Sequence, residues 1–345
     1  MNTRFLAVCL FLCFVVLSIG CAATPTPVPP TATLVPTIAP AATATSVEVT
    51  PGPTPTLHPA IQAATLPELA KREYAGSEIT TARVLTVTNA FTESLVTYVS
   101  DGVKVSGILT EPKGQGPFPG VVLVHGYFDP AQYQSGVATE RYAHLLAQNG
   151  FVAFAPDLRG YGSSEHGINL YMSGYIVDVL NAGAALKKLP NVDARHVGLW
   201  GHSMGAGLAA RAMVVSDMYQ AIVLYAPLSS DYTELFMDPM GGETAGMNTE
   251  IAVSLLQSVN DENLFAALSP KNFYARVTAP VSIHSGAADE VTPSEWAEAI
   301  YRGLKQANKS AEFFKYPGEG HIITGAQQQL LDTRILSFLN HALKK

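Results

Sequence analysis

The sequence predicts an α/β fold in which a mostly parallel sheet is covered by helices on both faces. Short apolar runs typical of buried strands alternate with helix-compatible stretches from residue 121 to the C-terminus. This alternation follows a strand-rich segment in which Asp101-Gly102, a strong hairpin signal, separates two strand-like runs. Residues 75–345 are large for one domain but lie within the range of α/β folds.

The expected elements follow one another in a simple order. The antiparallel start and the parallel strands are expected at 83–87, 95–99, 103–109, 121–124, 152–155, 197–200, 222–225, 281–284 and 312–316. Helices are expected between the later strands at 140–149, 176–189, 208–215 and 294–307, with a last helix near the C-terminus and a short one within 61–74. From these runs we expect a mostly parallel sheet of eight strands.

The stretch Gly201–Gly207 carries the strongest chemical signal. It contains the pattern G-x-S-x-G around Ser203, between an apolar strand-like run and a helix-compatible run. A strand, a tight turn and a helix in this order predict a nucleophile elbow, in which Gly201 and Gly205 let strand and helix approach closely. The alternative is a Gly/Ser turn without chemistry. His202 lies inside the turn, and we expect its side chain to face away from the reaction.

Residues 1–20 resemble a signal peptide, since Arg4 precedes an apolar run at 5–19. A small residue, Gly20, precedes Cys21, as in bacterial lipoprotein signals, so Cys21 is the expected lipidation site. An ordinary secretory signal that is cut elsewhere is the alternative. The prediction is an exported, extracytoplasmic protein that Cys21 anchors to the cell-envelope membrane.

A tether is expected over residues 21–74. From 22 to 59 the chain is almost entirely Thr, Pro, Ala and Val, with Glu48 its only carboxylate and no Lys or Arg. This composition cannot bury enough apolar surface to offset its ordering entropy, and Pro favours extended backbone. A tail without any spacing role is the alternative reading.

Composition excludes several classes of function for residues 75–345. No Cys follows Cys21, which excludes disulfides, a thiol nucleophile and thiolate metal sites there. The formal net charge is −7 and no basic run occurs, so nucleic acid is not an expected partner. No metal or other cofactor is expected, because metal-protease, P-loop and dinucleotide motifs are lacking.

These motifs together resemble a known family. The body is similar to α/β-hydrolases, and within them to the catalytic domain of prolyl oligopeptidase (S9-like) enzymes and to dienelactone-hydrolase-like serine hydrolases. The stretches that carry the resemblance are 122–126, 155–164, the elbow, 269–270, 279–281, 286–293 and 316–321. There are two departures: Ala206 stands where S9-like elbows usually have Gly, and a tether precedes the domain where those enzymes have a β-propeller.

The resemblance and the spacing imply a Ser-His-Asp triad. His321 follows a Gly-rich turn after the last strand, and Asp289 follows the strand at 281–284, which gives the Ser203, Asp289, His321 order of this fold. Asp231 is the alternative acid. For the oxyanion hole we expect the N–H groups of Met204 and Tyr127.

Two further expectations concern loops. Asp157 and Arg159 are expected to hold a loop together by ion pairing. An insertion at about 229–269 is expected to form a small lid over an acyl pocket lined by Met237, Met240, Met247, Ile251, Leu255 and Leu256. Plain packing is the alternative role for those apolar side chains.

The predicted function is that of a membrane-tethered, extracytoplasmic serine hydrolase that cleaves carboxylic esters through an acyl-enzyme. Its expected partner is a small-molecule ester or a short peptide, and no sequence feature sets an oligomeric state. The alternatives are an S9-like peptidase acting on short peptides and a non-catalytic binding lipoprotein on the same fold.

Overall fold

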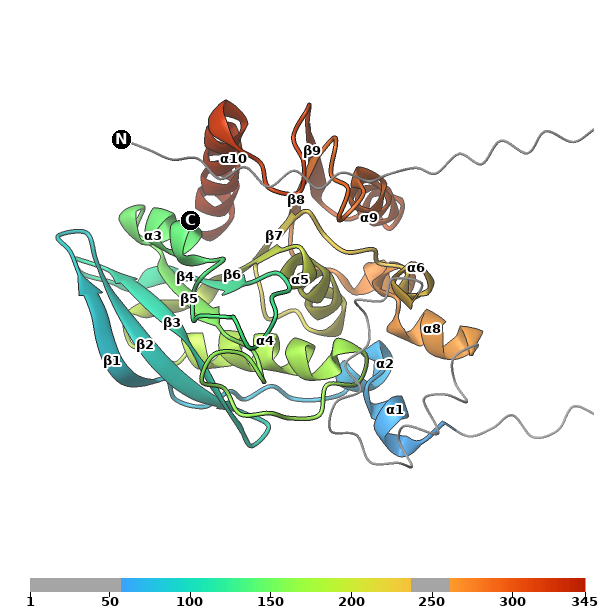
Figure 1. Ribbon diagram of the computed structural model, residues 1–345, viewed down its shortest axis with the longest axis horizontal. Helices are drawn as coiled ribbons and strands as arrows, with labels where there is room; N and C mark the ends of the chain where they lie inside the picture. The colour runs from blue at the N-terminus through green and yellow to red at the C-terminus, as the bar shows by residue number, and fades with distance from the viewer. Residues whose placement is uncertain (1–56, 237–260, 345) are drawn as a thin grey trace, which may run out of the picture. The chain divides into compact units, whose positions relative to one another are not determined.

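The computed structural model describes residues 57–236 and 261–344 (Figure 1). The expected signal peptide, Cys21, the tether up to residue 56 and residues 237–260 of the expected lid, with all six proposed pocket residues, lie outside the described part. Within that part, no helix is both long and apolar enough to cross a bilayer.

The described chain forms one sheet of nine strands in the order β1-β2-β3-β5-β4-β6-β7-β8-β9. The first three strands are antiparallel neighbours, β3 joins β5 antiparallel, and the pairs from β5 through β4 to β9 are parallel. The expected count of eight is one too low, because every strand-like run of the sequence joins the sheet. The strands are β1 Thr80–Val87, β2 Phe91–Ser100, β3 Val103–Pro112, β4 Phe118–Val124, β5 Val152–Pro156, β6 Val192–His202, β7 Ala221–Tyr225, β8 Val281–Gly286 and β9 Ala311–Tyr316.

Helices cover both faces of the sheet, as expected (Figure 1). Buried side chains of α4, α5 and α9 share one apolar cluster, and those of α3 and α10 share a second. Alternate residues of β4 divide between the clusters, Val122 and Val124 in the first and Val121 and Leu123 in the second. These helices are α3 Glu140–Gln148, α4 Ser173–Leu186, α5 Met204–Val215, α9 Ser294–Gln306 and α10 Gly325–Leu343.

The packed body begins earlier than the expected residue 75. Helices α1 (Pro59–Ala63) and α2 (Leu66–Leu69) bury Ile61, Leu66 and Leu69 in the cluster that contains α4 and α5. The part of the expected tether from residue 59 to 69 is therefore part of the core, because its apolar side chains find a buried surface. The described parts of the insertion are α6 Tyr232–Phe236, α8 Glu262–Leu268 and a 3₁₀ helix at Pro270–Arg276.

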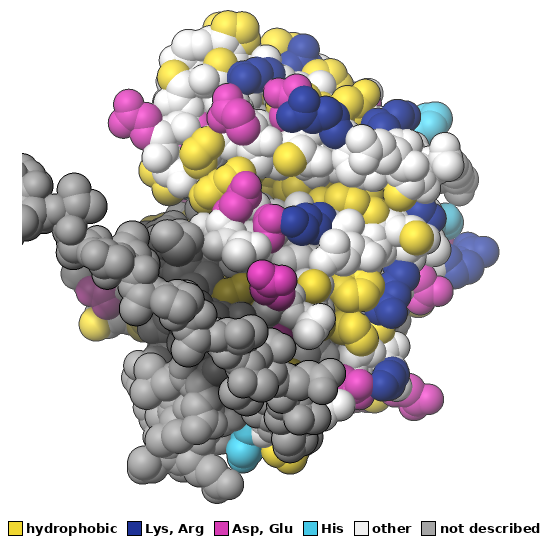
Figure 2. Space-filling view, turned by 90° about the vertical axis from the view of Figure 1, so that its right-hand side faces the viewer, with side chains coloured by type: hydrophobic (Ala, Val, Ile, Leu, Met, Phe, Trp, Pro, Cys, Tyr) yellow, Lys and Arg dark blue, Asp and Glu magenta, His cyan; other side chains and the backbone are white. Residues whose placement is uncertain are grey.

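The surface in Figure 2 carries charges of both signs. Lys and Arg side chains are interspersed with Asp and Glu on this face, with hydrophobic atoms between them. The described side chains visible in this view therefore form no large patch of a single sign.

Candidate active site

Ser203 sits in a strained turn between β6 and α5. Its backbone angles are φ 56° and ψ −121°, a region that L-residues rarely adopt, and its N–H donates to the Tyr225 carbonyl at 2.9 Å. A Cβ at Gly205 would lie 2.1 Å from the Val124 carbonyl oxygen, and one at Gly201 would lie 2.3 Å from the Gly205 oxygen. Both positions therefore require glycine, and the nucleophile-elbow geometry expected from the sequence is present.

The structure brings Ser203, His321 and Asp289 together. The His321 Nε2 atom lies 3.0 Å from the Ser203 Oγ atom. The Nδ1 atom of the same ring lies 2.9 Å from Asp289 Oδ2 and 3.2 Å from Oδ1. Ser203 and His321 are 118 positions apart in the chain, and these distances are within hydrogen-bond reach.

Asp289 is held as an acceptor by the loop that follows β8. It accepts from the Val291 N–H at 2.9 Å, the Thr292 N–H at 2.8 Å and the Thr292 hydroxyl at 2.8 Å. Burial acts to raise the pKa of Asp289, but hydrogen bonds from His321 and Thr292 outweigh it and hold the pKa below its usual value. An ionised carboxylate can only accept, so in the neutral His321 ring Nδ1 carries the proton and Nε2 is free to accept one from Ser203.

The alternative acid, Asp231, lies in another environment. It forms an ion pair with Lys271 and accepts hydrogen bonds from Thr233. Of the two candidate acids, Asp289 is the one that contacts His321.

The loop after β4 lies against the elbow. A Cβ at Gly126 would be 3.1 Å from the Ser203 Cβ atom, which puts the backbone that carries Tyr127 beside the nucleophile. Met204 is the first residue of α5, where a helix offers no internal acceptor for its N–H group. The two expected oxyanion donors thus lie on chain segments that adjoin Ser203, while the Tyr127 side chain is exposed.

His125 and Asp157 hold the loop after β4 in place through buried hydrogen bonds. The buried His125 ring contacts the Gly126 carbonyl through Nδ1 at 2.6 Å and the Asp157 carbonyl through Nε2 at 2.9 Å, and burial lowers its pKa. The Asp157 carboxylate accepts from the hydroxyls of Ser106 at 2.6 Å, Ser135 at 2.6 Å and Tyr133 at 3.0 Å. Asp157 therefore joins three segments by hydrogen bonds from uncharged hydroxyl donors, and it forms no ion pair with any residue that the structure describes.

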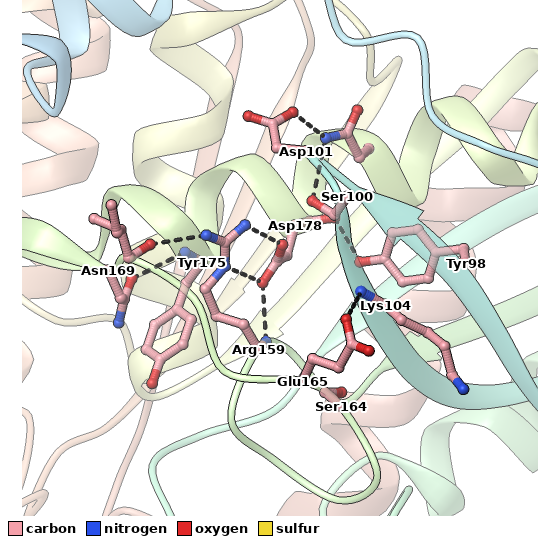
Figure 3. A network of polar contacts seen from close by, with 12 residues as sticks. Tyr98, Ser100, Asp101, Lys104, Arg159, Ser164, Glu165, Asn169, Tyr175 and Asp178 are labelled. Atoms are coloured by element: carbon pink, nitrogen blue, oxygen red, sulfur yellow. Dashed lines mark hydrogen bonds and ion pairs between the residues drawn. The ribbon is translucent and has the colours of Figure 1, made fainter. Parts of the chain in front are cut away.

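Arg159 forms an ion pair with Asp178 and not with Asp157. Its guanidinium bonds Asp178 of α4, with Nη2 to Oδ1 at 2.7 Å and Nε to Oδ2 at 2.9 Å (Figure 3). The expectation of a loop-holding ion pair is thus confirmed for Arg159, whereas Asp157 has no part in it. Asp178 is the one charged residue of the α4 sequence, and a lone carboxylate in a mostly apolar run was the signal that could have indicated a buried charged partner.

His202 departs from expectation. Its ring centroid lies 4.9 Å from that of His321, and its Nε2 atom lies 3.4 Å from the His321 carbonyl oxygen. These distances show that the His202 side chain faces the proposed base and not away from it. The ring also packs on Tyr225, at 4.4 Å between centroids. Burial, together with the nearby His321, lowers the pKa of His202 to about 4, so this ring is neutral at pH 7. Only its position next to Ser203 in the sequence could have pointed to this contact.

Comparison with known proteins shows the family of this chain. The model of the prolyl oligopeptidase family, peptidase S9, matches residues 138–345. Within the residues that the structure describes, no group of three or more His, Cys, Asp or Glu is arranged to hold a metal ion.

Curated relatives are distant and differ in length. The uncharacterized peptidase YuxL of Bacillus subtilis is 23% identical over 229 residues, which is 64% of this chain and 34% of that protein. The mouse peroxisomal succinyl-coenzyme A thioesterase is 22% identical, with 70% of this chain and 57% of that protein covered. A putative carboxymethylenebutenolidase of Escherichia coli is 22% identical, with 72% and 83% covered. The chain thus spans about a third of YuxL and just over half of the thioesterase.

Solved structures share the fold. Acetyl xylan esterase 1 from Thermoanaerobacterium has a TM-score of 0.62 at 19% identity, with 84% of this chain and 95% of that chain covered. An acylaminoacyl peptidase from Pyrococcus horikoshii has a TM-score of 0.60 at 19% identity, with 74% and 42% covered. Both likenesses show an α/β-hydrolase architecture.

Proposed function

The chain belongs to the prolyl oligopeptidase family and is a serine hydrolase, and from this premise we propose that it cleaves carboxylic esters through an acyl-enzyme on Ser203. The observation that carries the proposal is the continuous contact from Asp289 through His321 to the Ser203 hydroxyl, with distances of 2.9 and 3.0 Å. These are the distances at which a base can take the proton of a serine that attacks a carbonyl.

The proposed reaction has two halves. The Ser203 Oγ atom attacks the ester carbonyl carbon while His321 Nε2 takes the hydroxyl proton, and Asp289 stabilises the imidazolium. The oxyanion is stabilised by the N–H groups of Met204 and Tyr127 and by the N-terminus of α5. The C–O bond to the alcohol then breaks, and His321 returns the proton to the alcohol oxygen. Water repeats the sequence, with His321 as base, and releases the acid and free Ser203.

An ester is favoured over a peptide by the extent of the structural likenesses. The chain covers 95% of the acetyl xylan esterase, so nearly the whole architecture of an esterase has its counterpart in this chain. Peptide hydrolysis is the second candidate, because the family that matches is a peptidase family.

The experiment is a comparison of p-nitrophenyl acetate with aminoacyl p-nitroanilides, each rate divided by its uncatalysed rate, with Ser203→Ala as the control for both. The proposal predicts the larger enhancement for the ester and loss of both activities in the control. A larger enhancement for the anilides would make the protein a peptidase. If fluorophosphonate does not label Ser203, the acyl-enzyme proposal is wrong and the non-catalytic binding protein becomes the favoured alternative.

The proposed location rests on the sequence. We place the protein outside the cytoplasm, tied to the cell-envelope membrane by a lipid on Cys21, with a tether that ends before α1. The expected result is that Cys21→Ser moves the protein from the membrane fraction to the soluble fraction of the producing cells. Retention of that variant in the membrane fraction contradicts the proposed anchor.

A further inference from the structure

Two exposed apolar residues adjoin the proposed base or the carboxylate that contacts it. Ile322 follows His321 directly and is 58% exposed, and Val291 is 50% exposed. The Val291 N–H donates to Asp289 Oδ1 at 2.9 Å, so Val291 is tied to the carboxylate that contacts His321. Single exposed apolar residues are common on proteins, and it is the position of these two beside the base that calls for an explanation.

The chemistry of acyl transfer says which part of a substrate meets this surface. The leaving oxygen receives its proton from His321 Nε2, so the alcohol part of an ester lies against His321. The oxyanion donors belong to other segments, namely the start of α5 and the loop at Gly126. Side chains next to His321 therefore lie closer to the leaving group of the substrate than to its carbonyl oxygen.

Polar groups near His321 are largely occupied within the protein. The buried Thr292 hydroxyl lies 3.1 Å from the Ala226 carbonyl and 2.8 Å from Asp289 Oδ2, and Glu319 accepts from the Thr324 N–H at 2.8 Å. Ala287 and Ala288 of the same loop are exposed, which adds further alkyl surface. The loop after β8 also carries the exposed carboxylate of Glu290, which repels an anionic leaving group.

We infer that Val291 and Ile322 form the leaving-group site and that the alcohol part of the substrate presents an apolar, non-anionic group to them. The inference rests on the proposed ester hydrolysis and adds the class of alcohol to it. An alkyl group there covers the two side chains and is stabilised by their burial, whereas a polyol or a charged alcohol finds no partner among them.

The test uses acetate esters whose alcohols run from methyl to hexyl, with kcat/KM measured by titration of the released acid. For the wild type, the ratio of hexyl to methyl kcat/KM exceeds one. In Ile322→Ser and in Val291→Ser the ratio falls about 5-fold, the loss expected for about 1 kcal/mol of apolar contact. Ile322→Leu restores the ratio, because it keeps the alkyl volume.

The matched controls are Val84→Ser and Val87→Ser. These valines of β1 are 52% and 65% exposed and lie at the other end of the sheet from β9. Both variants keep the wild-type ratio. A ratio that does not change in Ile322→Ser and Val291→Ser overturns the inference, as does a wild-type preference for the acetate of a polyol or a charged alcohol. In either case ester hydrolysis itself stands, whereas a chain that hydrolyses no ester and leaves Ser203 unlabelled overturns both proposals.

Discussion

His202 links the elbow to the loop of the proposed base. Its Nε2 atom lies 3.4 Å from the His321 carbonyl, and its Nδ1 atom lies 3.5 Å from where a Gly126 Cβ would stand. The ring thus lies between the His321 loop and the loop proposed to carry an oxyanion donor. At the scale of single residues it acts on catalysis through its neighbours, as a positioning residue.

Replacing His202 tests this role. His202→Phe keeps a ring against Tyr225 but loses the nitrogen that faces the His321 carbonyl, so His321 is held less firmly. We expect kcat for p-nitrophenyl acetate to fall by about 3–10-fold with little change in KM, because the loss acts on alignment in the transition state. His341→Phe, which replaces an exposed histidine of α10, is the control. Unchanged kcat in His202→Phe contradicts a positioning role.

At the scale of elements, one buried ion pair joins the loop after β5 to α4. The side chains of Arg159 and Asp178 are 7% and 0% exposed, and Asp178 Oδ2 also accepts the Arg159 N–H at 2.9 Å. The same guanidinium donates through Nη1 to the Ile168 carbonyl at 2.8 Å, farther along the loop. The pair therefore ties the ends of this loop to the helix, and each charge depends on the other for solvation.

A double-mutant cycle measures that dependence. Asp178→Ala leaves a buried guanidinium without its partner, and we expect it to lower the free energy of unfolding by about 3–5 kcal/mol. The double variant Arg159→Met, Asp178→Ala removes both charges, and its loss is expected to be much smaller than the sum of the losses of Arg159→Met and Asp178→Ala measured singly. Urea unfolding gives these values. A double-variant loss equal to that sum shows that the pair does not couple.

The elements that the sequence predicts well are those with local signals. Apolar runs located each strand, and the two glycines around Ser203 identified the elbow, because sterics at that corner leave no other residue. The Ser-Asp-His order fits Asp231 as well as Asp289, and the position of Asp289 in the turn after the strand at 281–284 is the signal that favours it as the residue that contacts His321. The Arg159 partner and the direction of the His202 ring were missed, because each depends on contacts between segments far apart in the chain. The packing of 59–69 was missed for a similar reason, since its apolar residues are buried only by contact with distant segments such as α5.

At the scale of the whole molecule, a buried polar chain spans β8 and β9. Ser282 Oγ donates to Glu312 Oε1 at 2.7 Å and lies 3.0 Å from His284 Nε2, and His284 Nδ1 lies 2.9 Å from the Tyr316 hydroxyl. Since the Ser282 proton is used on Glu312, Nε2 carries the imidazole proton and Nδ1 accepts from Tyr316. Burial, helped by the positive charge of Arg334, lowers the pKa of His284 to about 3, so the ring stays neutral in the fold.

This histidine makes global stability depend on pH. In the unfolded chain it binds a proton near pH 6.5, but in the fold only near pH 3, so its contribution is complete above 6.5 and is lost as the pH falls from 6.5 towards 3. The loss approaches about 1.4 kcal/mol per pH unit within that window. We expect His284→Phe to be less stable at pH 7 but to show a shallower decline between pH 6 and 4, measured by urea unfolding. A decline as steep as that of the wild type contradicts this account.

The central claim is that His321 activates the Ser203 hydroxyl for attack on an ester. The most direct measurement is rapid-quench mass spectrometry of the protein mixed with p-nitrophenyl acetate, followed by peptide mapping. The account predicts one acetyl group on Ser203 within the first turnover, and formation slowed by about 10³-fold or more in His321→Gln. An acetyl group on another residue, or unchanged acetylation of Ser203 in His321→Gln, would contradict it.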